Sequence, residues 1–138
     1  MILQSTPVLF VHDIAASEHF FAKLGFKRTV EVPHGEELGF VIMTQAGEGG
    51  GDAGIGVMLQ TAASAADDSG LDASRFKTGS HLFMSVADLR AAETALSEFE
   101  IYMPRRDTFY GATEIGWMEP GGNHVTIAQF AAKSPDEA

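Results

Sequence analysis

The sequence has no cysteine, and this absence removes several kinds of chemistry at once. The chain cannot form a disulfide, a cysteine-ligated metal site or a cysteine nucleophile. It also lacks an apolar run near the roughly 20 residues needed to cross a bilayer, and no basic segment precedes an apolar run at its start. We therefore expect a soluble, cytoplasmic protein without a membrane partner.

Positive charge is scarce as well, since 9 basic residues stand against 19 acidic ones and give a formal net charge of -10. Such a charge opposes binding to phosphate backbones, so no nucleic-acid partner is expected. The motifs of nucleotide binding and hydrolysis are missing, including the P-loop, the GxGxxG turn, the serine nucleophile elbow and HExxH. The 138 residues favour a single domain.

What the sequence does contain is most clearly organised at residues 113–130. Two short stretches with apolar residues at every second position, 113–118 and 124–129, predict strands. The intervening EPGGN at residues 119–123 predicts a tight turn, because proline fixes φ early and glycine and asparagine tolerate positive φ. The second strand has one aliphatic face and one small or polar face that includes Thr126. This strand is expected to pack on a core and to line either water or a ligand cleft.

The same periodicities predict further elements along the chain. Strands are expected over residues 7–12, 26–32, 38–44, 55–61, 80–86 and 101–105, and amphipathic helices over residues 14–24 and 89–99. The single domain, residues 1–138, is expected to comprise a first module (1–61), a linker with at most a short helical turn (62–78), a second module (79–131) and a tail (132–138).

An internal duplication explains this arrangement. An offset of 75 residues, as between Asp13 and Asp88, aligns the first strand, helix cap and helix with later counterparts without a gap, and it places Thr6 on His81. Neither half could bury both faces of its own sheet. The expected fold is α+β, with two repeated βαβββ modules that form a curved mixed sheet around a concave cleft and carry their helices outside.

Two segments carry a resemblance to a known family: VHDIAASEHFFAKLGF at residues 11–26 and YGATEIGWMEPGGNHVTIAQF at residues 110–130. They resemble the signatures V-x-D-x-x-x-S-x-x-F-[FY]-x-x-L-G-F and [DE]-P-x-G-N of the vicinal-oxygen-chelate superfamily. This superfamily includes glyoxalase I, extradiol dioxygenases, fosfomycin-resistance enzymes and bleomycin-resistance proteins. The resemblance implies the fold but not the reaction, because one scaffold hosts different activities. It also implies a homodimer, since a second chain often completes the cleft of family members.

The resemblance implies where a metal would bind, because metal-dependent members hold a divalent ion with His, Gln or Glu at four strand positions. These positions fall on Thr6, on His81, on Thr126, and on Met58 or, after a register slip, Gln60. Zinc-like ions prefer imidazole and carboxylate to hydroxyl or thioether groups. Only His81 is therefore a good ligand, and we expect no bound metal; a divalent metal with relocated ligands is the alternative.

Alternation along the two opening strands indicates which side chains face the cleft. It places Thr6 and Phe10 on the cleft side of one strand, and His81 and Phe83 on the cleft side of the other. We expect Phe10 and Phe83 to be equivalent cleft aromatics, because aromatic walls suit flat organic ligands; filling of an ordinary core is the alternative. One interpretation of His81 is a hydrogen-bonding or acid–base group in contact with a ligand. The other is a remnant of a former metal site that now bonds to a neighbouring residue.

Tyr110 and Glu114 complete the candidate site. Tyr110 with Gly111 resembles the loop that closes over the ligand in many family members. Glu114 is a candidate base or a partner of His81 if it faces the cleft, and a solvated carboxylate if it does not. His124 lies on the face of Thr126, where it either contributes to the cleft or caps the rim of the sheet, and we expect the rim.

Two functions remain open at this point. The first is a glyoxalase/bleomycin-resistance-like protein that binds a small organic molecule in the cleft without a metal or turnover. The alternative is a lyase, isomerase or dioxygenase of the same superfamily that uses His81 and Glu114, with or without a divalent metal. The expected ligand-binding residues are Thr6, Phe10, His81, Phe83, Tyr110, Glu114 and Thr126.

Overall fold

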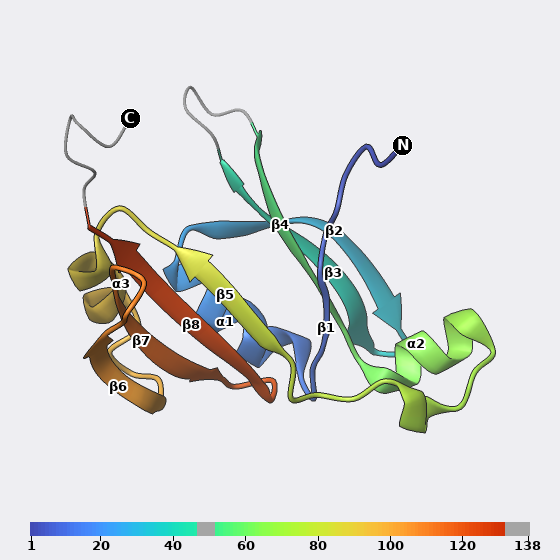
Figure 1. Ribbon diagram of the computed structural model, residues 1–138. Helices are drawn as coiled ribbons and strands as arrows, with labels where there is room; N and C mark the ends of the chain where they lie inside the picture. The colour runs from blue at the N-terminus through green and yellow to red at the C-terminus, as the bar shows by residue number, and fades with distance from the viewer. Residues whose placement is uncertain (47–51, 132–138) are drawn as a thin grey trace.

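One order of elements occurs twice in the computed structural model, which describes residues 1–46 and 52–131 (Figure 1). The first module contains β1 (Val8–Phe10), α1 (Ile14–Lys23), β2 (Phe26–His34), β3 (Glu37–Ala46) and β4 (Asp52–Gln60). The second module contains β5 (His81–Ser85), α3 (Leu89–Ala95), β6 (Ile101–Asp107), β7 (Ala112–Glu119) and β8 (Asn123–Phe130). Between them lie α2 (Ala62–Ser69) and the 3-10 helix η2 (Ala73–Arg75). The expected tail, residues 132–138, lies outside the described residues.

The two modules build sheets of the same topology. The strand order is β1-β4-β3-β2 in the first sheet and β5-β8-β7-β6 in the second. In each sheet the opening strand runs parallel to its neighbour, and the other pairs are antiparallel. The expected α+β fold of two βαβββ modules is therefore confirmed. Within the described residues no strand of one sheet pairs with a strand of the other, so the curved sheet consists of two four-stranded halves.

Equivalent aspartates begin the two equivalent helices. The Asp13 carboxylate accepts a hydrogen bond from the N–H of Ala15 (3.2 Å), and Asp88 accepts from the N–H groups of Arg90 (3.0 Å) and Ala91 (3.4 Å). Each side chain thus satisfies backbone donors that the first helical turn leaves free. None of the helices in the described part of the chain is long and apolar enough to cross a bilayer.

The duplication corrects one expected equivalence. The offset of 75 residues that aligns the helix caps relates Val8 to Phe83 and Phe10 to Ser85. The parallel registers of β1 with β4 and of β5 with β8 agree with this alignment. Phe10 and Phe83 are therefore not counterparts. The counterpart of Phe10 is Ser85, and the counterpart of Phe83 is Val8.

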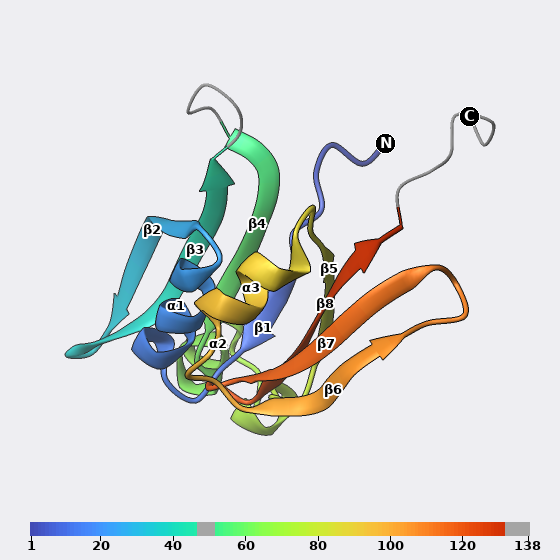
Figure 2. The same ribbon diagram turned by 90° about the vertical axis from the view of Figure 1, so that its left-hand side faces the viewer.

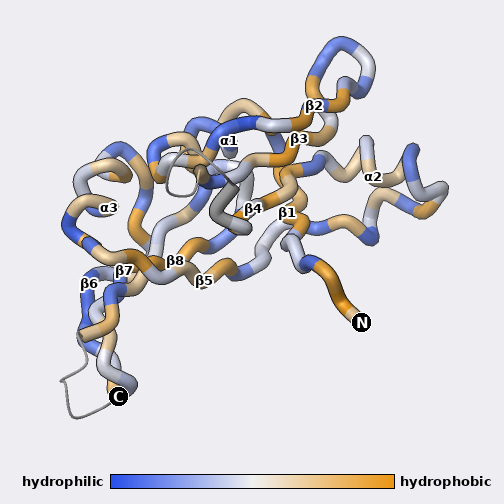
Figure 3. Tube along the Cα trace, turned by 90° about the horizontal axis from the view of Figure 1, so that it is seen from above, coloured by the Kyte–Doolittle hydropathy of each residue, from blue (hydrophilic) through white to orange (hydrophobic). Residues whose placement is uncertain are grey.

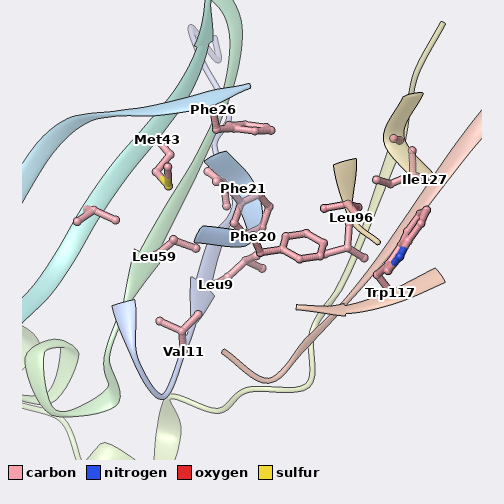
Figure 4. Packing of buried hydrophobic residues seen from close by; sticks show 14 of the residues in the cluster. Leu9, Val11, Phe20, Phe21, Phe26, Met43, Leu59, Leu96, Trp117 and Ile127 are labelled. Carbon is pink, nitrogen blue, oxygen red and sulfur yellow. The ribbon is translucent and has the colours of Figure 1, made fainter. Parts of the chain in front are cut away.

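A single apolar core lies between the two sheets, and α1 and α3 lie in the angle between them (Figures 2 and 3). Phe20 of α1 points toward Leu96 and Trp117 of the second module (Figure 4). Its ring also stands edge-on to Phe99, with centroids 5.0 Å apart. Phe20, Leu96 and Trp117 are at most 1% exposed. One face of each sheet is thus buried against the helices, and we call the other its open face.

The expected linker contains more structure than its sequence pattern indicated. α2 begins after Thr61, whose hydroxyl accepts from the N–H of Ser64 (3.2 Å), and it ends at Gly70 with a φ of 75°. Its alanines favour a helix but give no apolar periodicity, so the pattern indicated at most a short helical turn. Farther along, the ring of Phe76 packs on Phe10 with centroids 5.1 Å apart.

The EPGGN turn between β7 and β8 fixes the second module on the first. Glu119 is 1% exposed, and its carboxylate accepts a hydrogen bond from Ser17 Oγ of α1. The same carboxylate accepts from the Gly121 N–H and from Asn123 Nδ2 (3.0 Å). Asn123 Nδ2 also donates to the carbonyl oxygen of Phe10 in β1 (3.0 Å). The turn that carries the family resemblance therefore joins the two halves of the core.

Candidate functional site

The second sheet presents a polar and aromatic group on its open face. The strand register places His81 of β5 beside His124 of β8. Tyr102 of β6 contacts both His124 and Thr126 from the same side, whereas the opposite side of the sheet carries core residues such as Trp117. We call His81, His124, Tyr102 and Thr126 the His–Tyr cluster.

Ring contacts hold the His–Tyr cluster together. The imidazoles of His81 and His124 stack with centroids 4.2 Å apart and planes 11° apart. The Tyr102 ring stands edge-on to His124 at 5.0 Å, and its hydroxyl hydrogen-bonds with Thr126 Oγ1 at 2.7 Å. Gly116 of β7 makes room for this ring, since a Cβ there would lie 2.5 Å from a Tyr102 ring carbon. The result is one packed surface on which His81 and Tyr102 are exposed.

His124 is positioned by these ring contacts. Its Nδ1 is buried and has no hydrogen-bond partner among the described residues. A buried polar atom without a partner costs free energy, and such atoms in native proteins mark functional sites or bound water. The cluster therefore has a hydrogen-bonding capacity that folding alone does not use.

Glu114 also lies beside the open face, but its partners are Arg106 and Tyr110. The carboxylate is 2% exposed and accepts from Arg106 Nε (2.9 Å), Arg106 Nη2 (2.7 Å) and the Tyr110 hydroxyl (2.6 Å). Burial would raise the pKa of Glu114, but the hydrogen bonds from Tyr110 and Arg106 and the guanidinium charge outweigh it and hold the pKa below its ordinary value. The hydrogen bond to Glu114 in turn raises the pKa of Tyr110.

The strand register separates Glu114 from His81. His81 is level with His124, whereas Glu114 is level with Ala128 on the same strand. At about 3.3 Å per residue, these levels lie about 13 Å apart along the strand direction. The structure therefore does not bring Glu114 and His81 together as partners.

Tyr110 and Phe83 make aromatic contacts at the other end of this face. The ring centroid of Phe130 lies 6.1 Å from that of Tyr110 and 6.5 Å from that of Phe83. Phe83 is 52% exposed and Tyr110 is 43% exposed. Aromatic side chains thus continue along the open face beyond the His–Tyr cluster.

Thr6 and Phe10 lie with the first sheet, so the expected site is divided between two faces. Phe10 is half-buried and contacts Phe76, and Thr6 Oγ1 accepts a hydrogen bond from Gln4 Nε2 at 3.3 Å. In the described part of the chain no hydrogen bond or ring contact joins Thr6 or Phe10 to the His–Tyr cluster.

The four metal positions implied by the resemblance do not fit a zinc-like ion. They hold Thr6, His81, Thr126, and Met58 or, after a register slip, Gln60. The Thr126 hydroxyl is hydrogen-bonded to Tyr102, and Gln60 Nε2 donates to Ser64 Oγ at 3.3 Å. Over residues 1–46 and 52–131 no three His, Cys, Asp or Glu side chains are grouped so that they could hold a metal ion. His81 is the only imidazole at these four positions, and the stacked His124 would raise the number of imidazoles to two, short of the three protein ligands of a usual zinc site.

Sequence reasoning missed Tyr102 and placed His124 at the rim. Alternation alone places His124 on the face of Thr126, so the sequence pattern already indicated that His124 could line the cleft. The register of β6 shifts between Ile101 and Met103, and such an irregularity breaks the alternation that would have placed Tyr102.

Comparisons with known proteins agree with the fold. The family model described as Glyoxalase/Bleomycin resistance protein/Dioxygenase superfamily matches residues 4–127, whereas no curated protein sequence matches the chain. A glyoxalase-related enzyme from Fulvimarina pelagi has a TM-score of 0.69 at 14% identity, over 94% of this chain and 88% of that one. TnmS3, an antibiotic binding protein from Streptomyces sp. CB03234, has a TM-score of 0.65 at 16% identity, over 95% and 98%. The bleomycin resistance determinant encoded on the transposon Tn5 has a TM-score of 0.61 at 17% identity, over 95% and 100%.

At these identities the solved structures show the fold alone. The family model, by contrast, spans most of the sequence, and the duplicated strand order and the EPGGN turn agree with it. The chain therefore belongs to the glyoxalase/bleomycin resistance protein/dioxygenase superfamily.

Proposed function

We propose that the protein binds a small organic molecule with a flat ring on the open face of the second sheet, without a metal. The His–Tyr cluster carries this proposal. Stacked and edge-on rings with hydrogen-bonding groups suit a flat ligand that bears polar substituents. TnmS3 is an antibiotic binding protein of this fold, and another protein of this fold is a bleomycin resistance determinant, so a binding function is among those that the fold supports.

Each member of the cluster has a distinct part in this proposal. His81 and Tyr102 are exposed and contact the ligand directly. His124 holds the His81 ring by stacking beside it, and Thr126 fixes the Tyr102 hydroxyl by a hydrogen bond. Farther along the face, Phe83, Tyr110 and Phe130 extend the aromatic wall.

The alternative of a lyase, isomerase or dioxygenase that uses His81 and Glu114 has less support. Glu114 is enclosed by Arg106 and Tyr110, and its level on the sheet lies about 13 Å from that of His81. A carboxylate held in an ion pair with a lowered pKa is also a weaker base than an ordinary one.

The metal-free part of the proposal is tested by metal analysis of protein purified without chelator. We expect no stoichiometric zinc, nickel, manganese or iron. Added metal should leave the melting temperature unchanged, both in the parent and in His81→Ala. A ratio near one metal ion per chain that His81→Ala abolishes would move the protein into the enzyme class.

A homodimer is part of the same proposal. Both open faces expose large apolar side chains, and those assigned to the proposed interface are between 40% and 52% exposed: Val8, Val32, Phe83 and Phe130. Apolar surface of this extent favours burial against a second chain, which would close the cleft over a ligand. Sedimentation of the protein as a monomer at micromolar concentration would contradict the proposed homodimer. A cytoplasmic location remains a prediction.

Native mass spectrometry tests the binding itself. Protein purified from cell extract should retain a small organic molecule, seen as an added mass that organic solvent releases. His81→Ala and Tyr102→Ala should reduce the retained fraction. Val30→Ala, on the open face of the first sheet, serves as the matched control and should retain the molecule as the parent does. Equal retention by all three variants would contradict the proposed site.

A further inference from the structure

A cavity of about 290 Å³ lies between the two modules, separate from the His–Tyr cluster. Its apolar walls come from both modules and include Leu24 and Phe26 of the first, and Met84, Val86 and Ile127 of the second. Phe26 and Ile127 are at most 4% exposed, whereas the other three side chains are only partly buried. The fold thus leaves a space beside its core that the protein's own side chains do not fill.

The cavity follows the free edge of β5. It touches the four consecutive residues 83–86, and successive residues of a strand face opposite sides, so the cavity wraps around the strand edge. Within the described residues β5 pairs only with β8, and the Val86 N–H donates to the carbonyl of Ala128 (2.8 Å). The peptide groups of Phe83 and Ser85 therefore point to the unpaired edge.

Two side chains add polar groups to this apolar space. The Gln45 amide is fixed because its Nε2 donates to the carbonyl oxygen of Leu24 at 2.6 Å, which leaves the amide oxygen as an acceptor. The Ser85 hydroxyl lies on the exposed side of β5. Gln45 and Ser85 therefore add side-chain hydrogen-bonding groups to a wall whose other side chains are apolar.

We propose that this cavity binds a small amphipathic molecule with an aliphatic chain and a single hydroxyl or carbonyl head. An apolar cavity of about 150 Å³ holds benzene in another protein, so the present volume has room for roughly 10 to 12 non-hydrogen atoms. The chain of the ligand lies against Phe26, Met84 and Ile127, and the head meets Gln45, Ser85 or the strand edge. Because the walls come from both modules, the bound molecule bridges them.

A series of straight-chain primary alcohols from 1-butanol to 1-decanol tests the site on the intact protein. Each added methylene that enters the cavity should tighten binding about fourfold, measured by calorimetry. The gain should stop at roughly eight to ten carbons, when the cavity is full. The same titrations followed by methyl NMR should shift the resonances of Met84, Val86 and Ile127, while the open-face methyls of Met58 and Met118 stay in place.

Two variants sharpen the test. Val86→Phe fills the cavity from its wall, and Ile55→Trp fills it from its 52% exposed rim, where a larger side chain does not disturb the core. Either should weaken 1-octanol binding by tenfold or more. Val30→Trp is the matched control, because it places the same bulk on the open face of the first sheet and should leave octanol binding unchanged.

Three results would overturn the proposal. The first is an affinity that rises with chain length without a break, as expected of adsorption to any apolar surface. The second is a set of methyl shifts at Met58 or Met118 instead of Met84. The third is equal octanol binding by the parent and by folded Ile55→Trp. Phe83 borders both sites, but none of these results involves the four residues of the His–Tyr cluster, so a failure here is distinguishable from a failure of the proposed function.

Discussion

The two modules share one strand order, yet their open faces carry different chemistry. At equivalent places, a row of four side chains crosses each sheet. The row is Val8, Met58, Ile42 and Val30 in the first sheet, and Phe83, Thr126, Gly116 and Met103 in the second. The first row is apolar throughout, whereas the second has a hydroxyl at its centre and a glycine that accommodates the Tyr102 ring.

The buried faces of the two sheets do not differ in this way. Val57 and Leu59 of β4 and Val125 and Ile127 of β8 are all aliphatic and at most 1% exposed. A buried face must fill the core, and this requirement keeps both copies alike. The open faces have no such requirement, so their divergence points to recognition by the second sheet and to coverage of the first by other apolar surface.

The largest expected effect tests whether the EPGGN turn of the second module holds the two modules together. Glu119→Ala removes the acceptor of Ser17, Gly121 and Asn123 in the buried turn. We expect a loss of about 3 kcal/mol in the free energy of unfolding, because several buried donors lose their partner together. Urea unfolding measures it. Glu36→Ala in the exposed β2–β3 turn is the control, and an equally small loss for both variants would show that the turn does not hold the modules together.

A smaller effect is expected from the ion pair beside the open face of the second sheet. Glu114→Gln should lower the free energy of unfolding by about 1 kcal/mol near neutral pH, since Arg106 is 56% exposed and water screens the charge. The folded pKa of Glu114 is lowered, so its stabilisation is present above the ordinary value of 4.5 and is lost as the pH falls through the folded pKa.

The difference between parent and Glu114→Gln should therefore shrink on acidification below about pH 4. Thermal unfolding from pH 3 to pH 7 measures this difference. Glu93→Gln, whose pair with Arg105 is exposed, should leave stability unchanged at every pH. A difference for Glu114→Gln that grows toward acid pH would show that the carboxylate is not stabilised as described.

The smallest effects test the likeness of the modules rather than their difference. Asp13→Ala and Asp88→Ala each remove the capping acceptor of an equivalent helix. Each substitution should cost about 1 kcal/mol of unfolding free energy, and the two costs should agree within about 0.5 kcal/mol. A cost for only one of them, measured in urea, would mean that the two helices do not contribute alike.

The sequence alone predicted the parts of the fold that depend on local pattern. Strand periodicity, the Asp13 and Asp88 caps and the EPGGN turn defined both modules, because each signal needs only neighbouring residues. At most a short helical turn was predicted where α2 forms, since alanine favours a helix without giving it an apolar stripe. The division into two half-sheets also could not be predicted, because it depends on packing between distant elements.

The candidate site was predicted in part. His81, Phe83 and Thr126 lie on the face that alternation assigned to them, because strand residues alternate wherever the strand is regular. Tyr102 was missed because a register shift in β6 breaks the alternation. Alternation left open whether Glu114 faces the cleft, and its pairing with Arg106 and Tyr110 depends on the register between β6 and β7, which no local pattern encodes.

The central claim is that the second sheet, and not the first, provides the recognition surface. Acridine orange is a suitable probe, because it is a flat cation and the net charge of -10 favours cations. A fluorescence titration should give saturable binding that Tyr102→Ala weakens about tenfold, through loss of ring contact and buried area. Val30→Ala should change the dissociation constant by less than about twofold, since its side chain lies on the other sheet. Equal affinities for the parent and Tyr102→Ala, or a loss confined to Val30→Ala, would contradict the claim.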